Sequence, residues 1–213
     1  MESRMFKAYA KGDEKIQLKI IPGHFATSQS HITHYLDMTT MKTRCAEASR
    51  IARLLSTRYE TSTPVDTIVC LDGLEVVGAF LAEELAKAGV LSMNAHKTIY
   101  IITPEFNANG QMLFRDNTQH MVRNRNVVIL MGSITTGVTL QQCIKSILYY
   151  GGKIQGVSAI FSAINSVAGL DVNAVYYKQD IPNYETYAAD HCPMCQKKVK
   201  IDAIVNGYGY SKL

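Results

Sequence analysis

A short apolar strand that leads through a turn of small and hydroxyl residues into a helix is the feature that most constrains this chain. Residues 127–139 read VVILMGSITTGVT, and a helix-forming stretch continues over 139–150. Such a turn gathers unpaired backbone N–H groups and the positive end of the helix dipole around one concavity, which suits a phosphate. An ordinary strand-to-helix turn, which often carries Gly and Thr, is the alternative. The candidate phosphate-binding residues are Ser133, Thr135, Thr136, Gly137, Val138 and Thr139.

Short apolar runs alternate with helical patterns along much of the chain. This alternation predicts an α/β fold with a mostly parallel, doubly wound sheet, in which ligands bind beyond the carboxyl ends of the strands. The loops after Leu71, Thr103 and Met131 are therefore expected to converge. The predicted strands are 67–71, 99–103, 127–131, 157–163 and 172–177, and the predicted helices are 41–59, 75–88 and 139–150.

Three further segments have weaker patterns. Residues 1–22 are charged and then apolar, which is typical of an edge strand or a short helical arm. Residues 23–37 have no clear period and are predicted as a structured loop. Residues 111–114 are expected to return beside the 99–103 strand as a hairpin, with a turn at Asn109-Gly110.

The stretch ITTG at 134–137, after an apolar strand, resembles the ribose-phosphate signature of the type I phosphoribosyltransferases, with orotate phosphoribosyltransferase as the most similar subgroup. ITTG is the one specific motif of a similarity that covers most of residues 20–180. The residues that carry the rest of it are 23–25, 27–28 and 35–37 in the segment that packs over the base, 68–78 at the pyrophosphate loop, and 149–152.

The resemblance implies a phosphoribosyltransferase-like domain over 1–180, in which 1–40 covers the site, followed by a short appendage at 181–213. It implies transfer of a phosphoribosyl group from phosphoribosyl pyrophosphate to a base, most like orotate, as in pyrimidine biosynthesis. Mg²⁺ and a homodimer that completes its sites across the subunit interface are implied as well. The matching positions are Phe25, Ser28 and His31 for the base pocket and Leu71, Asp72 and Gly73 for the pyrophosphate loop.

The sequence also departs from the family at residues that carry the chemistry. Met131 and Gly132 stand where the family has two carboxylates that hold the ribose hydroxyls, and neither side chain replaces them. The region of the mobile catalytic loop, 102–120, has Arg115 as its only strong cation. Asp72 and Arg115 are therefore the candidate catalytic residues. Asp72 is placed to hold Mg²⁺ or a sugar hydroxyl, whereas the charge of Glu75 more simply complements a helix dipole.

Two functions remain open at this point. The first is an orotate-type phosphoribosyltransferase, which the resemblance favours. The second is a non-catalytic sensor or regulator that binds phosphoribosyl pyrophosphate or a nucleotide on the same fold, which the missing carboxylates favour.

Composition narrows the class of protein. The 213 residues are 47% hydrophobic, enough for a substantial core, and the net charge of +4 arises from 22 basic and 18 acidic residues. That surplus suits an anionic small ligand and falls short of the concentrated basic face of a nucleic-acid binder. No apolar run approaches the ~20 residues needed to cross a bilayer. Residues 1–15 carry no apolar signal-peptide core, so a cytoplasmic location is expected.

The five cysteines fall into two groups. Cys45, Cys70 and Cys143 lie in apolar patterns and are expected to be small buried residues in a reducing compartment. Cys192 and Cys195 form a CxxC turn that resembles half of a zinc ribbon. A Zn²⁺ site needs four ligands, so the others would come from Cys45, a distant His or a partner chain; a free-thiol turn is the alternative.

Three histidines lie close together in the sequence, at His24, His31 and His34. No regular helix or strand spacing brings all three to one point, and no carboxylate is regularly placed beside them. They are therefore expected to be surface or base-pocket histidines rather than metal ligands.

Overall fold

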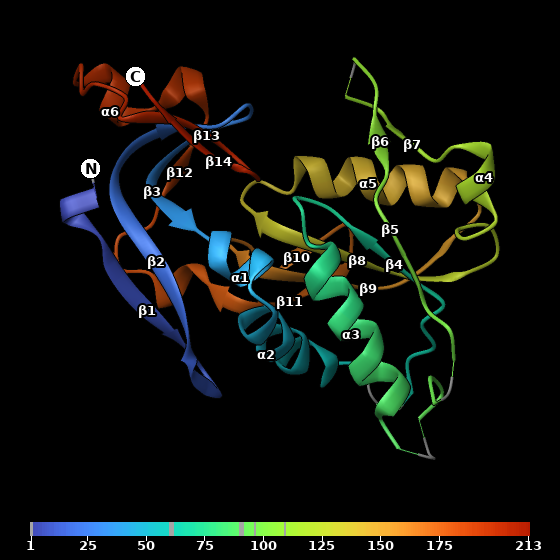
Figure 1. Cartoon of the computed structure of the whole chain (residues 1–213). Helices are drawn as coiled ribbons and strands as arrows, with labels where there is room; N and C mark the ends of the chain where they lie inside the picture. Colours follow the sequence, from blue (N-terminus) through green and yellow to red (C-terminus); the bar gives the residue numbers. More distant parts are fainter. Residues whose placement is uncertain (1, 60–61, 90–91, 96, 109) are drawn as a thin grey trace.

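Six strands form a central sheet in the order β10-β11-β9-β8-β4-β5 (Figure 1). The computed structural model describes residues 2–59, 62–89, 92–95, 97–108 and 110–213, so Asn109 of the expected turn lies outside the described residues. Neighbouring strands are parallel except for β10 with β11, which confirms the predicted mostly parallel α/β fold. The strands are β4 (Thr67–Cys70), β5 (Tyr100–Ile102), β8 (Asn126–Ile134), β9 (Lys153–Ser162), β10 (Ser166–Val167) and β11 (Leu170–Tyr177).

Helices cover both faces of the central sheet (Figure 1). Val128 and Leu130 of β8 belong to the core that includes α2 and α3, whereas Val127, Ile129 and Met131 belong to the core that includes α5. Such a continuous apolar run is what a parallel strand buried on both faces requires. The covering helices are α2 (Cys45–Ser56), α3 (Glu75–Lys87) and α5 (Val138–Tyr149).

The helix predicted over 41–59 is broken at Arg44, whose backbone is extended with φ −99° and ψ 118°. A short helix, α1 (Thr39–Thr43), therefore precedes α2. Cys45, expected to be buried, is instead exposed because it begins α2 at this break. Cys70 and Cys143 are buried as expected, and burial raises the pKa of Cys143 to about 12.

A second sheet, which we call the hood, is built from both ends of the chain, and both termini lie on its side of the molecule (Figure 1). Its order is β12-β3-β2-β13-β14, with β1 paired to β2. The strands are β1 (Phe6–Ala10), β2 (Asp13–Ala26), β3 (His31–Asp37), β12 (Thr186–Tyr187), β13 (Ala203–Asn206) and β14 (Gly209–Lys212).

The prediction of a loop over 23–37 is wrong, because most of these residues lie in β2 and β3. The two strands pair antiparallel, with a shift in register between Pro22 and Phe25 that obscures the alternating pattern. Residues 203–204 pair in parallel with residues 25–26 at the end of β2. The division into a domain over 1–180 and an appendage over 181–213 remains a proposal. In the structure, strands from residues 181–213 complete the hood.

A small hairpin and several short helices complete the described fold. Residues 112–113 pair with β6, not with the 99–103 strand as expected, because the chain turns back after Thr103. Within the described residues, no helix has the length and apolar character needed to cross a membrane. The remaining elements are β6 (Glu105–Phe106), β7 (Met112–Leu113), α4 (Asp116–Gln119), α6 (Pro193–Gln196) and the 3-10 helices η1 (Glu2–Arg4), η2 (Lys178–Asp180) and η3 (Ala189–His191).

We expect His34 to make the stability of the hood dependent on pH. Its ring stacks on Tyr184 with centroids 6.0 Å apart and meets the Phe6 ring edge-on at 6.3 Å. Burial lowers the pKa of His34 from its ordinary 6.5. The unfolded chain therefore takes up a proton at higher pH than the folded protein. Stability from this residue is complete above about pH 6.5 and is lost as the pH falls through the folded-state pKa.

We expect His34→Phe to lose less stability than the wild type between about pH 7 and 5, because the titrating group is gone. Thermal melts across this range measure the difference. His191→Asn, which changes an exposed histidine, is the control and should follow the wild type. Parallel pH curves for the wild type and His34→Phe would contradict the assignment.

Candidate functional site

A cavity of about 500 Å³ lies between the carboxyl ends of the central strands and the hood. As predicted, the loops after Leu71 and Met131 converge there. Within the described residues, the loop after Thr103 does not line the cavity. The turn between β13 and β14 forms another wall, with residues 206–209. A cavity of this size can hold a nucleotide-sized ligand.

The turn from β8 into α5, residues 135–140, forms what we call the phosphate cup. Within the described residues, the N–H groups of Thr135, Thr136 and Gly137 donate no hydrogen bond. The N–H groups of the first turn of α5 lack intrahelical acceptors, as at any helix start. Thr135, Thr136 and Thr139, each of which carries a hydroxyl, line the cavity. Free donors thus surround the positive end of a helix dipole, an arrangement that suits an anion.

Gly137 is required in the cup by its backbone and its packing. It has φ +80°, a left-handed conformation that residues with a Cβ seldom adopt. A Cβ there would lie 2.9 Å from Val167 Cγ2 and 3.0 Å from Ile164 Cδ1. The constraint at this position therefore comes from the wall behind the cup.

Asp72 stands beside the end of β8, next to the position of the missing carboxylates. Its Oδ2 accepts the N–H of Gly132 at 3.0 Å. Asp72 and Gly73 have φ +58° and +75°, and Asp is among the residues that tolerate the left-handed conformation. A Cβ at Gly132 would lie 3.1 Å from Asp72 Cβ. The absence of a side chain at Gly132 therefore leaves room for the Asp72 carboxylate.

Lys42, which the sequence reasoning missed, brings a buried cation to the same place. Its Nζ donates to the carbonyl oxygens of Asp72 at 2.8 Å and Gly207 at 2.7 Å. Burial lowers the pKa of Lys42, and the nearby charges of Asp72 and Glu75 oppose that change. In the described part of the chain, Lys42 and Asp72 are the only charged residues lining the cavity. A lysine after Met41 in a helical pattern carries no signal for this role, since its partners are distant in sequence.

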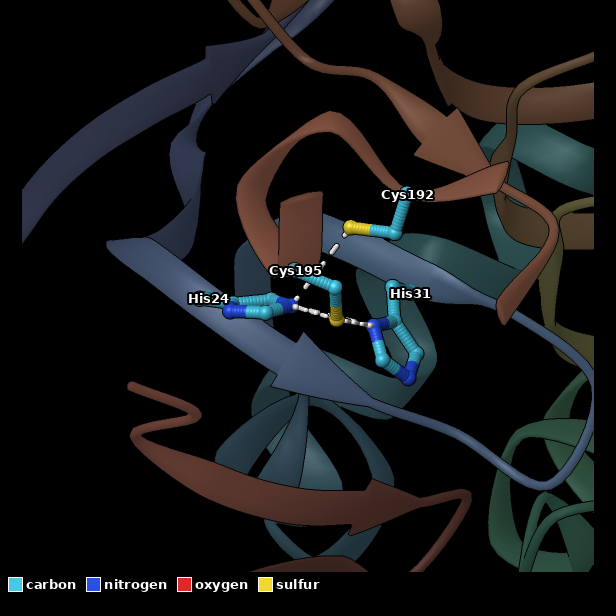
Figure 2. A group of neighbouring side chains, drawn as sticks. All are labelled: His24, His31, Cys192 and Cys195. Carbon is cyan, nitrogen blue, oxygen red and sulfur yellow. Dashed lines mark hydrogen bonds between the residues drawn. The ribbon is translucent and has the colours of Figure 1, made fainter. Parts of the chain in front are cut away.

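The three base-pocket candidates are not brought together. Ser28 lines the cavity. Phe25 is buried in the core of the hood, with its ring 6.0 Å from that of Tyr35. The His31 ring points toward His24 and the CxxC turn (Figure 2).

Three other residues singled out from the sequence also lie apart from one another. Leu71 is buried in the core beside α5. Arg115 is on the exposed hairpin, where its Nε and Nη2 donate to the two carboxylate oxygens of Glu105 at 2.7 and 2.6 Å. Glu75 accepts a hydrogen bond from the Thr103 hydroxyl at 2.7 Å. Of the two catalytic candidates, only Asp72 lines the cavity.

Cys192 and Cys195 lie with His24 and His31 in one cluster, where the CxxC turn meets β2 and β3 (Figure 2). His24 and His31, which were expected at the surface or in the base pocket, instead lie beside these two thiols. His34 lies elsewhere, against Tyr184. The fold brings the cluster together from both ends of the chain, so regular spacing could not have revealed it.

Comparisons with known proteins agree with this fold. No protein-family model matches the sequence. An orotate phosphoribosyltransferase from Desulforamulus reducens is 24% identical over 180 residues, which cover 84% of this chain and 85% of that relative. The structure of Mycobacterium tuberculosis orotate phosphoribosyltransferase superposes with a TM-score of 0.51 at 16% identity, covering 76% of this chain and 91% of that one.

A third similar protein is Leishmania donovani UMP synthase, with a TM-score of 0.55 at 16% identity. The match covers 75% of this chain and 34% of the UMP synthase chain. The chain therefore has the fold of the type I phosphoribosyltransferases, and its sequence is similar to that of an orotate phosphoribosyltransferase.

Proposed function

We propose that this phosphoribosyltransferase-like protein binds a ribose 5-phosphate compound, either phosphoribosyl pyrophosphate or a nucleotide, and transfers the phosphoribosyl group to an orotate-like base. The observation that carries the proposal is the phosphate cup, whose residues have free N–H groups and hydroxyls and line a cavity of about 500 Å³. The similarity to an orotate phosphoribosyltransferase supports the choice of reaction.

The geometry suggests a role for each wall of the cavity. The 5-phosphate would sit in the cup at the start of α5. A pyrophosphate group would lie toward the Asp72-Gly73 turn and the Lys42 ammonium, which offsets the negative charge of Asp72. The base would then lie beneath the hood, near Ser28. Transfer forms a bond from the ribose carbon to a base nitrogen as the bond from that carbon to pyrophosphate breaks.

Mg²⁺ is part of the proposal only as an ion that arrives with the substrate. Mg²⁺ usually takes one or two carboxylates together with phosphate oxygens and water. Asp72 offers one carboxylate, one oxygen of which already accepts the Gly132 N–H. The described residues around the cavity therefore do not form a Mg²⁺ site by themselves.

A homodimer, a cytoplasmic location and a place in pyrimidine biosynthesis belong to the same proposal. The relative's name supports the last of these. Analytical ultracentrifugation of the purified chain measures the first. A monomer with full ligand affinity would remove the dimer from the proposal.

The alternative function is a non-catalytic sensor that uses the same cavity. Met131 lines the cavity and Gly132 adjoins it, where carboxylates would be needed to hold the ribose hydroxyls. This substitution favours binding without rapid turnover. The two functions predict the same ligand but different rates of phosphoribosyl transfer.

Calorimetric titration with phosphoribosyl pyrophosphate, orotidine 5-monophosphate, orotate and inorganic phosphate, each with and without Mg²⁺, tests the binding proposal. Compounds that carry a ribose 5-phosphate should bind, and orotate alone should bind weakly. The absence of binding by every ribose 5-phosphate compound would overturn the proposed function.

Replacing Lys42 by Met should weaken binding of phosphoribosyl pyrophosphate by about tenfold or more. A hydrogen bond or close contact to a charged group is commonly worth about 1.5–3 kcal/mol, and Met fills the same volume without a charge. Titration calorimetry measures the loss. Lys145→Met, on the exposed side of α5, is the control. Equal affinities in the two variants would contradict a role for Lys42.

A further inference from the structure

Four side chains with metal-binding atoms converge where the hood meets the C-terminal segment (Figure 2). His24 lies near the end of β2 and His31 begins β3. Cys192 immediately precedes α6 and Cys195 lies within it. The ligand atoms of all four lie within 4.8 Å of one another. His24 and Cys192 are buried, and Cys195 is exposed, so an ion could enter from solvent.

The distances between the ligand atoms are close to those of a tetrahedral site. His24 Nε2 lies 3.0 Å from His31 Nδ1 and 3.6 and 3.7 Å from the sulfurs of Cys192 and Cys195. Cys195 Sγ lies 3.3 Å from His31 Nδ1. A tetrahedral Zn²⁺ with Zn–N of about 2.0–2.1 Å and Zn–S of about 2.3 Å separates its ligand atoms by about 3.3 to 3.8 Å. The cluster therefore needs only small adjustments to surround one ion.

The residues around His24 orient its ring for this role. His24 Nδ1 donates to the carbonyl oxygen of Val199 at 2.9 Å, which leaves the lone pair of Nε2 directed at the cluster. The backbone N–H of His24 donates to Asp202 Oδ2 at 3.0 Å, and Asp202 N donates to the His24 carbonyl at 2.7 Å. A histidine that donates through its other nitrogen to a carbonyl is the usual arrangement of a metal ligand.

The CxxC turn is shaped to present both sulfurs to the same point. Pro193 begins α6, and Gln196 N donates to the Cys192 carbonyl at 3.1 Å. The turn closes with Lys198 at φ +56°, after which Val199 N donates to the Met194 carbonyl. The chain then returns to His24.

We propose that His24, His31, Cys192 and Cys195 bind one Zn²⁺ per chain as a closed structural site. Two thiolates neutralise the charge of the ion, and a Cys₂His₂ set with no open position suits structural Zn²⁺ better than a catalytic ion. All four ligands belong to one chain, so neither Cys45 nor a partner chain is required.

The position of the site indicates what the ion does. Just after the CxxC turn, Ala203 pairs with Phe25, the neighbour of His24. The β13–β14 turn that follows lines the cavity, and its Gly207 carbonyl accepts a hydrogen bond from Lys42. The ion therefore ties the C-terminal segment to β2 and β3 and holds that wall of the cavity in place.

Metal content is the direct test. The full chain is purified without chelator and without a histidine tag from cells grown with added zinc, and its metals are measured by atomic emission. About one zinc per chain is expected. Adding Co²⁺ to the metal-free protein should produce the visible bands of tetrahedral cobalt and the near-ultraviolet bands of thiolate-to-cobalt charge transfer. Iron in place of zinc, or no metal with Cys192 and Cys195 freely titratable in addition to the exposed Cys45, would overturn the proposal.

Substitutions distinguish the four proposed ligands from other cysteines and histidines of the chain. Cys195→Ser and His31→Asn should lose zinc. Cys45→Ser, which changes the exposed first residue of α2, and His191→Asn, which changes the exposed residue before Cys192, should retain it. Full zinc retention by Cys195→Ser and His31→Asn would contradict the ligand set. The cobalt spectrum of the wild type keeps the test valid if a ligand variant does not fold.

Limited digestion with trypsin tests the structural role without reference to ligand binding or activity. Lys197, Lys198 and Lys200 are exposed in and after the CxxC turn. Removal of zinc by a chelator should speed cleavage at these lysines, and added zinc should restore resistance. Equal cleavage rates with and without zinc would show that the ion does not hold the segment. These readouts can succeed even if the proposed phosphoribosyl ligand fails to bind.

Discussion

Gly137→Val is expected to weaken binding of a nucleoside 5-monophosphate by about ten- to a hundredfold. The new side chain would collide with Val167 and Ile164 and move the cup. Displacing one hydrogen bond to a charged phosphate commonly costs about 1.5–3 kcal/mol, and 1.4 kcal/mol is about a factor of ten. Titration calorimetry with orotidine 5-monophosphate and with inorganic phosphate measures the change.

Gly151→Val is a matched control for this experiment. Gly151 also has φ +80°, so both variants carry the same backbone strain, but the nearest atom to a Cβ at Gly151 is Arg123 Cγ at 3.8 Å. Thermal melts of both variants separate a loss of affinity from a loss of folding. Should Gly137→Val fold and bind as the wild type does, the cup is not the phosphate site.

Transfer to orotate is expected to be at least about a hundredfold slower than ordinary enzyme turnover, which is roughly 1 to 1,000 per second. Removing one interaction that stabilises a transition state commonly costs about a hundred- to a thousandfold in rate. Here Met131 and Gly132 supply no carboxylate, and Arg115 is paired with Glu105 on the exposed hairpin. Release of pyrophosphate from phosphoribosyl pyrophosphate with orotate, with and without Mg²⁺, measures the rate.

Asp72 is the residue expected to carry whatever transfer remains. Asp72→Asn should reduce the transfer rate by a further factor of about ten, with little change in nucleotide affinity. Asn also tolerates a positive φ and keeps an oxygen for the Gly132 N–H, so the fold should be preserved. Asp171→Asn, an exposed carboxyl near Arg58, is the control. Rapid turnover by the wild type, unchanged in Asp72→Asn, would show that other residues replace the missing pair.

The limited space at Gly132 hinders an attempt to restore activity by putting the acidic residue back. Restoring an acidic residue there would place a Cβ 3.0 Å from Lys42 Nζ and 3.2 Å from Asp72 Oδ2. Activity gained by a Met131→Glu, Gly132→Asp variant would therefore require Asp72 to move. A gain is expected only if the same protein also carries a smaller residue at position 72.

Several features could be predicted because their determinants are local. The strand, turn and helix at 127–150 are contiguous, and the buried run of β8 can satisfy its backbone only within a sheet covered on both sides. Alternation of such strands with helices predicted the central sheet. The converging loops after Leu71 and Met131 followed, because parallel strands end at one edge.

The hood was missed because its pattern is not local. Its strands come from both chain ends, and a register shift near Pro22 interrupts the alternation in β2. Lys42 likewise gains its role only from carbonyls 30 and 165 positions away. The sequence offers no preference that distinguishes this lysine from any other at the edge of a helix.

The sequence by itself determined the central α/β sheet, the phosphate cup and the presence of two thiols spaced for a metal, because each depends on neighbouring residues. Only the tertiary structure decided that Asp72 lies against Gly132, that Lys42 enters the cavity, and that Cys192 meets His24, 168 positions away in the chain. The physical reason is that hydrogen bonds and metal ligation depend on distances of a few ångströms, and between remote segments these distances are set by the packing of the two sheets.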